Sequence, residues 1–159
     1  ALFRATGDRP GEAHALDNLG VAWRDSGQAA RAEEAFRQAR VLHAATGDPR
    51  GQAKALMHLG EMAQAAGRLS EARDAYAQAL SLHRATRERA GEATALHALG
   101  NVAAATRQPG PAAERYRQAL ALYRGIGDRA KEAHVLRSLA RLERARGRDA
   151  DAQAHLARA

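Results

Sequence analysis

The feature of this sequence that most restricts its fold is an internal repeat with a period of forty residues. The chain aligns with itself at that shift without a gap along its whole length. Two leucine positions set the register: Leu16, Leu56, Leu96 and Leu136, then Leu19, Leu59, Leu99 and Leu139. A fixed period of this size is typical of a solenoid, in which similar units stack and hide their apolar faces against one another.

Each repeat is predicted to contain two helices. In the first repeat, small and apolar residues recur every three or four positions over residues 13–23 and again over residues 32–42. Each stretch therefore has one apolar helical face. Gly27 and Gly67 follow the first helix of their repeats, where a residue that tolerates positive φ lets the chain reverse. We expect Gly147 to end the first helix of the fourth repeat in the same way.

The second helix of a repeat is expected to end at a Gly-Asp pair. Three junctions share this pair: Gly7-Asp8, Gly47-Asp48 and Gly127-Asp128. The glycine suits the left-handed position that follows a helix, and the aspartate can accept hydrogen bonds from the free N–H groups of the next helix. Arg87 and Glu88 replace the pair at the remaining junction, so we expect that junction to be weaker.

The predicted fold is an all-α solenoid of antiparallel helix pairs. Its expected parts are the tail of a preceding second helix and four repeats, the last truncated: residues 1–8, 9–48, 49–88, 89–128 and 129–159. Because the chain opens and ends within a predicted helix, we expect it to be a segment of a longer array. An uncapped end face would be apolar. One hypothesis is therefore head-to-tail self-association, with residues 1–8 completing a neighbour's last helix; the alternative is that these residues fray.

The composition supports helices and excludes several classes of site. Hydrophobic residues make up 45% of the chain and aromatic residues only 4%. The absence of cysteine excludes disulfides, thiolate metal ligands and cysteine nucleophiles. No stretch approaches the apolar length that a membrane span needs, so a cytoplasmic protein is expected. The net charge of +7 permits an acidic or nucleic-acid partner, but the arginines are scattered among carboxylates at helical spacing, as on a solvated face.

The spacing of the packing residues resembles a known motif. The pattern is Leu16-x-x-Leu19-Gly20-x-x-Trp23, followed by Ala32-x-x-x-Phe36 and Ala39. It is similar to the tetratricopeptide repeat, although the period is forty instead of thirty-four residues. The resemblance implies a right-handed superhelix whose first helices line a concave groove for a protein or peptide. Leu-Gly and Gly-Asp-Arg-x-x-Glu-Ala junctions also resemble sensor arrays of bacterial regulators and spindle-orientation adaptors, and the Ala/Arg bias favours the bacterial group.

The groove candidates lie about 100° around the first helices from the leucine face. They are Asp17, Arg24, Lys54, Met57, Glu61, Gln64, His97, Asn101, Arg137, Arg141 and Arg144. The last three form an arginine row at spacings of four and three, which suits the carboxylates of an acidic peptide. The alternative is a row of solvated arginines paired with Glu143 and Asp149.

The resemblance also bears on individual groove residues. Asn101 directly follows Leu99-Gly100 and matches the asparagine with which adaptors of this family bind the ligand backbone. The family's carboxylate-clamp pattern of Lys, Asn, Asn, Lys and Arg is not reproduced, so we do not expect a chaperone tail as ligand. Trp23 is better placed as a core residue than as a surface for stacking a ligand.

Histidines offer a weaker hypothesis. His58, Glu61 and His97 could converge between adjacent first helices, and two imidazoles with a carboxylate can hold zinc. No fourth ligand is evident, and we expect no metal or cofactor. His43 and His83 align with aromatic residues of other repeats and are expected to be packing positions.

Protein or peptide binding is the leading function, within a larger bacterial regulator or scaffold. A nucleic-acid binder is the first rival because of the positive charge, but the chain lacks interleaved aromatic residues, so we do not expect this partner. An enzyme is not expected, because the sequence has no Gly-rich phosphate loop, activated serine or metal motif. A self-assembling scaffold, whose only partner is itself, is the remaining alternative.

Overall fold

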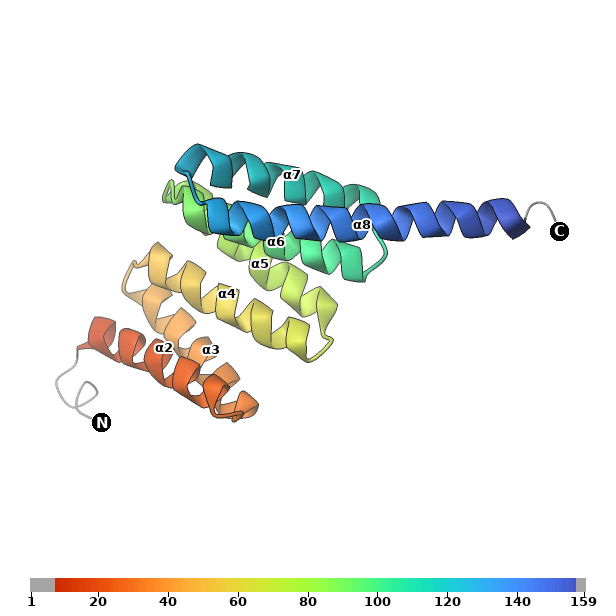
Figure 1. Ribbon diagram of the computed structural model, residues 1–159. Helices are drawn as coiled ribbons and strands as arrows, with labels where there is room; N and C mark the ends of the chain where they lie inside the picture. The colour runs from red at the N-terminus through yellow and green to blue at the C-terminus, as the bar shows by residue number, and fades with distance from the viewer. Residues whose placement is uncertain (1–7, 157–159) are drawn as a thin grey trace. The chain divides into compact units, whose positions relative to one another are not determined.

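The computed structural model describes residues 8–156, with side chains described through residue 147. Within these residues the chain forms seven α-helices and no strand (Figure 1). The helices are α2 (Arg9–Asp25), α3 (Ala29–Ala45), α4 (Pro49–Ala65), α5 (Leu69–Ala85), α6 (Arg89–Ala105), α7 (Pro109–Ile126) and α8 (Arg129–Leu156). The chain divides into two compact units, Ala1–Gly91 and Glu92–Ala159, which are described separately below.

Aspartate side chains begin the first helix of three repeats. Asp8 Oδ1 accepts a hydrogen bond of 2.9 Å from the Gly11 amide, and Asp48 Oδ1 accepts one of the same length from the Gly51 amide. Asp128 caps α8 in the same way through the Lys131 amide, at 3.0 Å. Each carboxylate satisfies an N–H that the helix itself leaves free. The capping role that the Gly-Asp junctions predict is therefore confirmed.

An aromatic ring packs onto a glycine in each of the first three repeats. The pairs are Gly20 with Phe36, Gly60 with Tyr76, and Gly100 with Tyr116. A Cβ atom on Gly20 would lie 2.5 Å from the Phe36 ring, and one on Gly100 would lie 2.5 Å from the Tyr116 ring. All three rings are at most 3% exposed. The glycine and the ring therefore recur at the same spacing because the two helices of each pair contact each other closely at this point.

Four glycines and two arginines occupy equivalent turns in the left-handed region. The glycines have φ values of 68° to 78° and are Gly27, Gly47, Gly67 and Gly127. Arg87 and Arg107 adopt the same conformation at φ 56° and 57°. The turn therefore keeps its geometry without glycine, because the helices on either side fix it. A side chain in this region costs about 1–2 kcal/mol. The weaker junction expected at Arg87 stays a prediction.

Replacing either arginine with glycine is expected to stabilise the protein. Arg87→Gly or Arg107→Gly removes the Cβ conflict at positive φ and should raise the free energy of unfolding by about 1 kcal/mol, measured by urea denaturation. The control is Arg73→Gly in the exposed interior of α5, which should lower it by about 1 kcal/mol. A loss of stability in all three variants would contradict the assignment of strain to the two turns.

The fourth repeat differs from its prediction. Helix α8 continues without a break from Arg129 to Leu156, so the expectation that Gly147 ends a helix is wrong. A glycine inside a helix costs only about 1 kcal/mol, and residues 148–156 consist mainly of good helix formers. The repeat also has leucine at position 156, where the other three repeats have an aromatic ring, so a reversed helix has less apolar area to bury.

The predicted leucines are not equally buried in all repeats. In α4 Leu56 is 2% exposed, because the preceding helix α3 packs against α4. In α2 Leu19 is 45% exposed, and in α8 Leu136 is 43% exposed, so the prediction of a buried face fails for these two residues. No earlier helix pair covers α2 within the described residues. Trp23 is partly buried against the cluster that includes Phe36, as expected of a core residue.

Candidate functional site

Two of the predicted groove residues are buried instead of exposed to a ligand. Asp17 is 1% exposed and Met57 is 9% exposed. Both lie three residues before the glycine that contacts the ring of their repeat. Positions three apart share a helical face, so these side chains turn toward the helix pair's interior. The assignment of Asp17 and Met57 to a ligand-binding surface is therefore wrong, whereas Lys54 is exposed as expected.

Three other groove candidates of the first unit bond to side chains within the unit: Arg24, Glu61 and Gln64. Arg24 of α2 reaches Glu61 of α4, with 3.5 Å between Nη1 and Oε2, and lies 3.4 Å from His58 Nδ1. His58 Nδ1 is in turn 3.3 Å from Glu61 Oε2. Gln64 Oε1 accepts a hydrogen bond of 3.2 Å from the Tyr76 hydroxyl. These polar groups link helices within the unit, so their capacity for a ligand is already partly used.

Of the three residues that the sequence suggested for zinc, the structure shows two in contact. His58 and Glu61 meet in the first unit, whereas His97 lies in the second unit and bonds to another residue there. Within the described residues, the group of side chains that could hold a metal is a different one, formed by His14, Asp17 and His43.

In the second unit, hydrogen bonds between side chains join α6, α7 and α8. The Tyr116 hydroxyl donates to Asn101 Oδ1 at 2.8 Å, and His97 Nε2 lies 3.0 Å from Ser138 Oγ. The His97 and Tyr116 rings contact each other, with centroids 5.6 Å apart. Asn101 is therefore held by Tyr116 through its oxygen, which leaves its amide nitrogen as the group that can bond to a ligand. Ser138, which the sequence placed only at the border of the groove, is part of this cluster.

The cluster is biased toward uncharged side chains. Burial raises the pKa of Tyr116, against the opposing effects of the Arg141 charge and the Ser138 hydrogen bond. Burial also lowers the pKa of His97, and the nearby charge of His134 adds to this effect. The phenol and the imidazole thus both favour their neutral forms at neutral pH.

A stability change at mild acidity should follow from His97. The unfolded chain binds a proton on this imidazole near the ordinary pKa of about 6.5, whereas the folded chain binds it only at lower pH. Stability is therefore expected to fall as the pH drops below about 6.5, until the folded-state pKa is passed. Thermal unfolding from pH 8 to 5 should show this loss in the native sequence and a shallower loss in His97→Gln. Identical pH profiles for the two proteins would refute the assignment.

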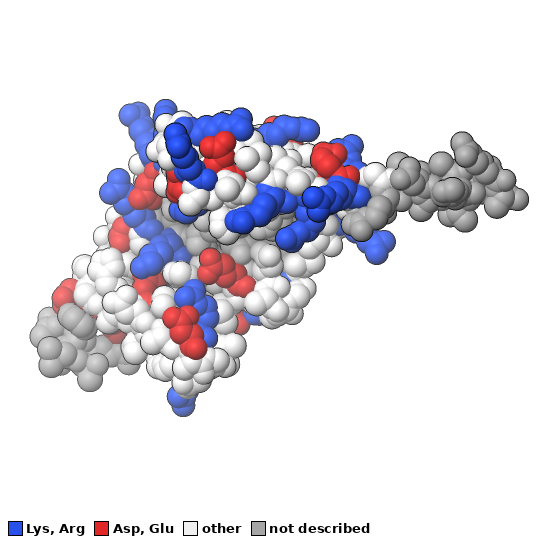
Figure 2. All heavy atoms as spheres, in the orientation of Figure 1, with Lys and Arg blue, Asp and Glu red and all other residues white. Residues whose placement is uncertain are grey.

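The predicted arginine row is exposed on α8. Arg137, Arg141 and Arg144 make no ion pair with the side chains that the structure describes, which end at residue 147. Asp149, one proposed partner of the row, lies outside them. Glu143, a proposed partner of the row, instead lies 3.4 Å from Arg146. Residues 129–147 contain six Lys and Arg residues against two Glu residues. Figure 2 shows basic side chains gathered over α8. The row therefore offers guanidinium groups that the described residues do not neutralise.

Repeated antiparallel helix pairs, packed through matched leucine, glycine and ring positions, define an α-solenoid repeat protein. Sequence profiles of one family, the tetratricopeptide repeat, match residues 13–46 and 51–125. The chain belongs to the tetratricopeptide repeat family. Proteins built from this fold are in general protein–protein interaction modules. No curated protein matches the chain, and within the described residues no helix is both long enough and apolar enough to cross a membrane.

Several solved structures are similar in fold. A protein of Podosopora anserina, described as a kinesin light chain with nearly identical TPR-like repeats, aligns with a TM-score of 0.71 and 21% identity over 84% of this chain. BtubC from P. vanneervenii aligns with a TM-score of 0.64 and 16% identity over 85% of this chain. MamA aligns with a TM-score of 0.59 and 21% identity over 92% of this chain and 85% of its own. This chain spans 66% and 64% of the lengths of the first two proteins.

Proposed function

We propose that this chain is a peptide-binding module whose ligand is an acidic segment bound along Arg137, Arg141 and Arg144. The observation that supports this function is the arginine row itself. Its three guanidinium groups lie on one face of α8 without a carboxylate partner in the described residues. A row spaced by four and three residues presents charges about one helical turn apart, at intervals that an extended peptide can follow.

The neighbouring polar cluster extends this surface within the second unit. Arg141 lies near enough to Tyr116 to influence its pKa, and Tyr116 holds Asn101 by a hydrogen bond. The Asn101 amide can donate to a peptide carbonyl while the arginines bind carboxylates. Charge-assisted bonds of this kind contribute about 1.5–3 kcal/mol when well formed, and exposed ones contribute less. We therefore expect micromolar rather than nanomolar affinity.

The proposal is tested by fluorescence anisotropy with two labelled twelve-residue peptides. One contains Asp and Glu at alternate positions, and the other has Asn and Gln in their place. The acidic peptide should bind, and its affinity should fall as salt is raised, because the contact is electrostatic. Equal binding of the two peptides, or no binding of either, would contradict the proposal.

The same assay addresses the nucleic-acid alternative. A duplex DNA of twelve base pairs serves as competitor at two salt concentrations. Nucleic-acid binding predicts a steep salt dependence and displacement of the peptide by DNA. Acidic-peptide binding without displacement by DNA supports a protein partner.

Self-association is a second candidate, favoured by a separate observation. Leu19 on α2 is 45% exposed, and Val41 on α3 is 57% exposed. We propose that a second copy of the chain can cover these residues, as a neighbouring helix pair covers Leu56. The specific contact expected from the sequence involves residues 1–8, most of which lie outside the described residues. Light scattering should show dimers at high concentration that Val41→Glu abolishes; a monomer at all concentrations would exclude this function.

The wider setting also remains a proposal. We propose that the module acts in the cytoplasm as part of a larger bacterial regulator or scaffold, with binding and not catalysis as its role. The Ala/Arg-rich composition and the Gly-Asp junctions support this setting. The chain is immobilised as bait in a bacterial extract to test this setting. It should capture proteins that the variant with the arginine row replaced by alanine does not capture.

A further inference from the structure

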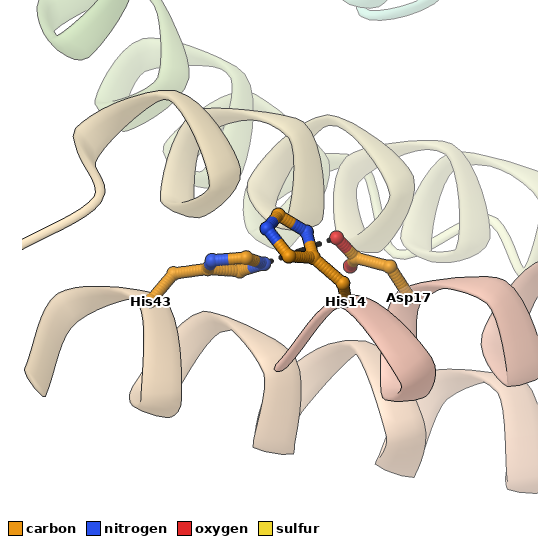
Figure 3. A group of neighbouring side chains, drawn as sticks. All are labelled: His14, Asp17 and His43. Carbon is orange, nitrogen blue, oxygen red and sulfur yellow. Dashed lines mark hydrogen bonds and ion pairs between the residues drawn. The ribbon is translucent and has the colours of Figure 1, made fainter. Parts of the chain in front are cut away.

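Two histidines and an aspartate meet on the first helix pair, away from the arginine row. His14 and Asp17 lie one turn apart on α2, and His43 projects from α3 toward both (Figure 3). One nitrogen of each histidine and a carboxylate oxygen of Asp17 all lie within 4.8 Å of one another. His43 Nε2 is 3.1 Å from Asp17 Oδ2. Imidazole and carboxylate groups in this number form a three-ligand set for a divalent transition metal.

The carboxylate of Asp17 is only half satisfied by the protein. Asp17 is 1% exposed, and its second oxygen, Oδ1, is buried with no hydrogen-bond partner. An unpaired buried carboxylate oxygen is costly, because it has lost its water without gaining a donor. A cation at this point would compensate for that loss. This unpartnered oxygen is evidence for a ligand that does not depend on the proximity of the three side chains.

A second carboxylate orients the His43 ring. His43 Nδ1 lies 2.9 Å from Asp48 Oδ2. When Nδ1 donates its proton to this carboxylate, Nε2 faces Asp17 with a lone pair that can bind a metal. The Gly51 amide donates a hydrogen bond of 2.9 Å to the other oxygen of Asp48, Oδ1, and so holds this carboxylate in place. Gly51 also packs so closely on the His43 ring that a Cβ atom would overlap it. Metal-binding histidines commonly have such a carboxylate on the other nitrogen, which fixes the tautomer that coordinates.

The remaining ligand can complete the site by a small movement. Tetrahedral zinc, with bonds of about 2.0–2.2 Å, holds its ligand atoms about 3.3 Å apart. Asp17 and His43 are already near that spacing. His14 is exposed, and its ring lies edge-on to the His43 ring with centroids 5.1 Å apart, so a change of its side-chain rotamer can bring a nitrogen to the metal. A water molecule would fill the fourth position. The two charges of Zn²⁺ would be balanced by Asp17 and the nearby Asp48.

We propose that His14, Asp17 and His43 bind one Zn²⁺ ion, which fastens α2 to α3 in the first unit. The other repeats provide an internal comparison. The corresponding residues of the second repeat are Lys54, Met57 and His83, and those of the third are Thr94, His97 and Tyr123. Neither set contains two imidazoles and a carboxylate. The zinc site is therefore specific to the first repeat.

Zinc binding is tested by titration calorimetry and thermal unfolding of the full chain without a polyhistidine tag. One Zn²⁺ per chain should bind, and the melting temperature should rise when zinc is added. His14→Ala should weaken binding by about 10-fold or more without altering the fold, because this side chain is exposed. The matched control is His134→Ala, an exposed histidine in the second unit, which should leave zinc binding unchanged.

Cobalt provides a readout that stability does not affect. Co²⁺ bound in place of zinc should give the visible absorption of a tetrahedral complex, and Asp17→Asn should abolish it. Absence of zinc binding at 100-fold excess of metal would overturn the proposal. So would equal affinity in the native chain, His14→Ala and Asp17→Asn, because the ion would then be bound elsewhere.

Discussion

Tyr76→Ala is expected to lower the free energy of unfolding by about 3–5 kcal/mol, the range typical of a buried aromatic ring replaced by alanine. Tyr76 is 2% exposed, and its ring lies against Gly60 on the facing helix. The glycine has no side chain that could fill the space left by the ring. The cavity should therefore stay largely open, and urea denaturation followed by circular dichroism should show a large shift in midpoint.

The control for this variant keeps the ring and removes only its hydroxyl group. Tyr76→Phe loses the hydrogen bond to Gln64, which should cost about 0.5–1.5 kcal/mol. The same position is phenylalanine in the first repeat, so the ring alone fits the site. If Tyr76→Ala and Tyr76→Phe lost equal stability, the packing of ring on glycine would not be the main source of stability here.

The packing of the repeats could be predicted because the same pattern of packing residues occurs in several repeats of the sequence. Leu56, Gly60 and Tyr76 each have counterparts forty residues away, and the contact between glycine and ring recurs with nearly the same geometry. A single helix would not reveal which of its small residues face a neighbour. Repetition separates positions that packing constrains from those that vary, and only the constrained positions identify the family.

The predicted groove residues vary from repeat to repeat, and two of them are buried in the structure. Asp17 was assigned to the surface by its angle from the leucines, yet it shares a face with Gly20 and is buried. That angle describes one helix by itself and does not show which residues of other helices lie beside it. Asp17 Oδ2 lies 3.1 Å from Nε2 of His43, which is 26 residues away on another helix. A pair of this kind has no periodic signal, so the sequence did not show it.

The turns show a second limit of prediction from local residue preferences. Arg107 adopts positive φ at the position that glycine holds in the first two repeats, while Gly147 lies inside a helix where a turn was expected. The preference of a single residue for a turn or a helix is about 1 kcal/mol, and it decides the local structure only when packing does not oppose it. Between α6 and α7 the packed helices impose the turn. At Gly147 the local preference of the flanking residues for helix prevails.

Replacing Arg137, Arg141 and Arg144 with alanine is expected to reduce the affinity for the acidic twelve-residue peptide by about 30-fold or more. Loss of three charge-assisted contacts, each contributing about 0.7–1 kcal/mol at an exposed site, gives about 2–3 kcal/mol. The salt dependence of binding should weaken together with the affinity. Fluorescence anisotropy at two ionic strengths measures both effects.

The matched control removes the same net charge from second helices of the repeats. Arg31, Arg73 and Arg117 are exposed on α3, α5 and α7, and their triple alanine variant should bind the acidic peptide with an affinity within about 3-fold of the native protein. Thermal unfolding should change little in the α8 variant, because the row makes no ion pair within the described residues. Equal losses of affinity in the two triple variants would show that overall positive charge attracts the peptide. A loss confined to Arg137, Arg141 and Arg144 would place the peptide on α8, because both variants remove three positive charges.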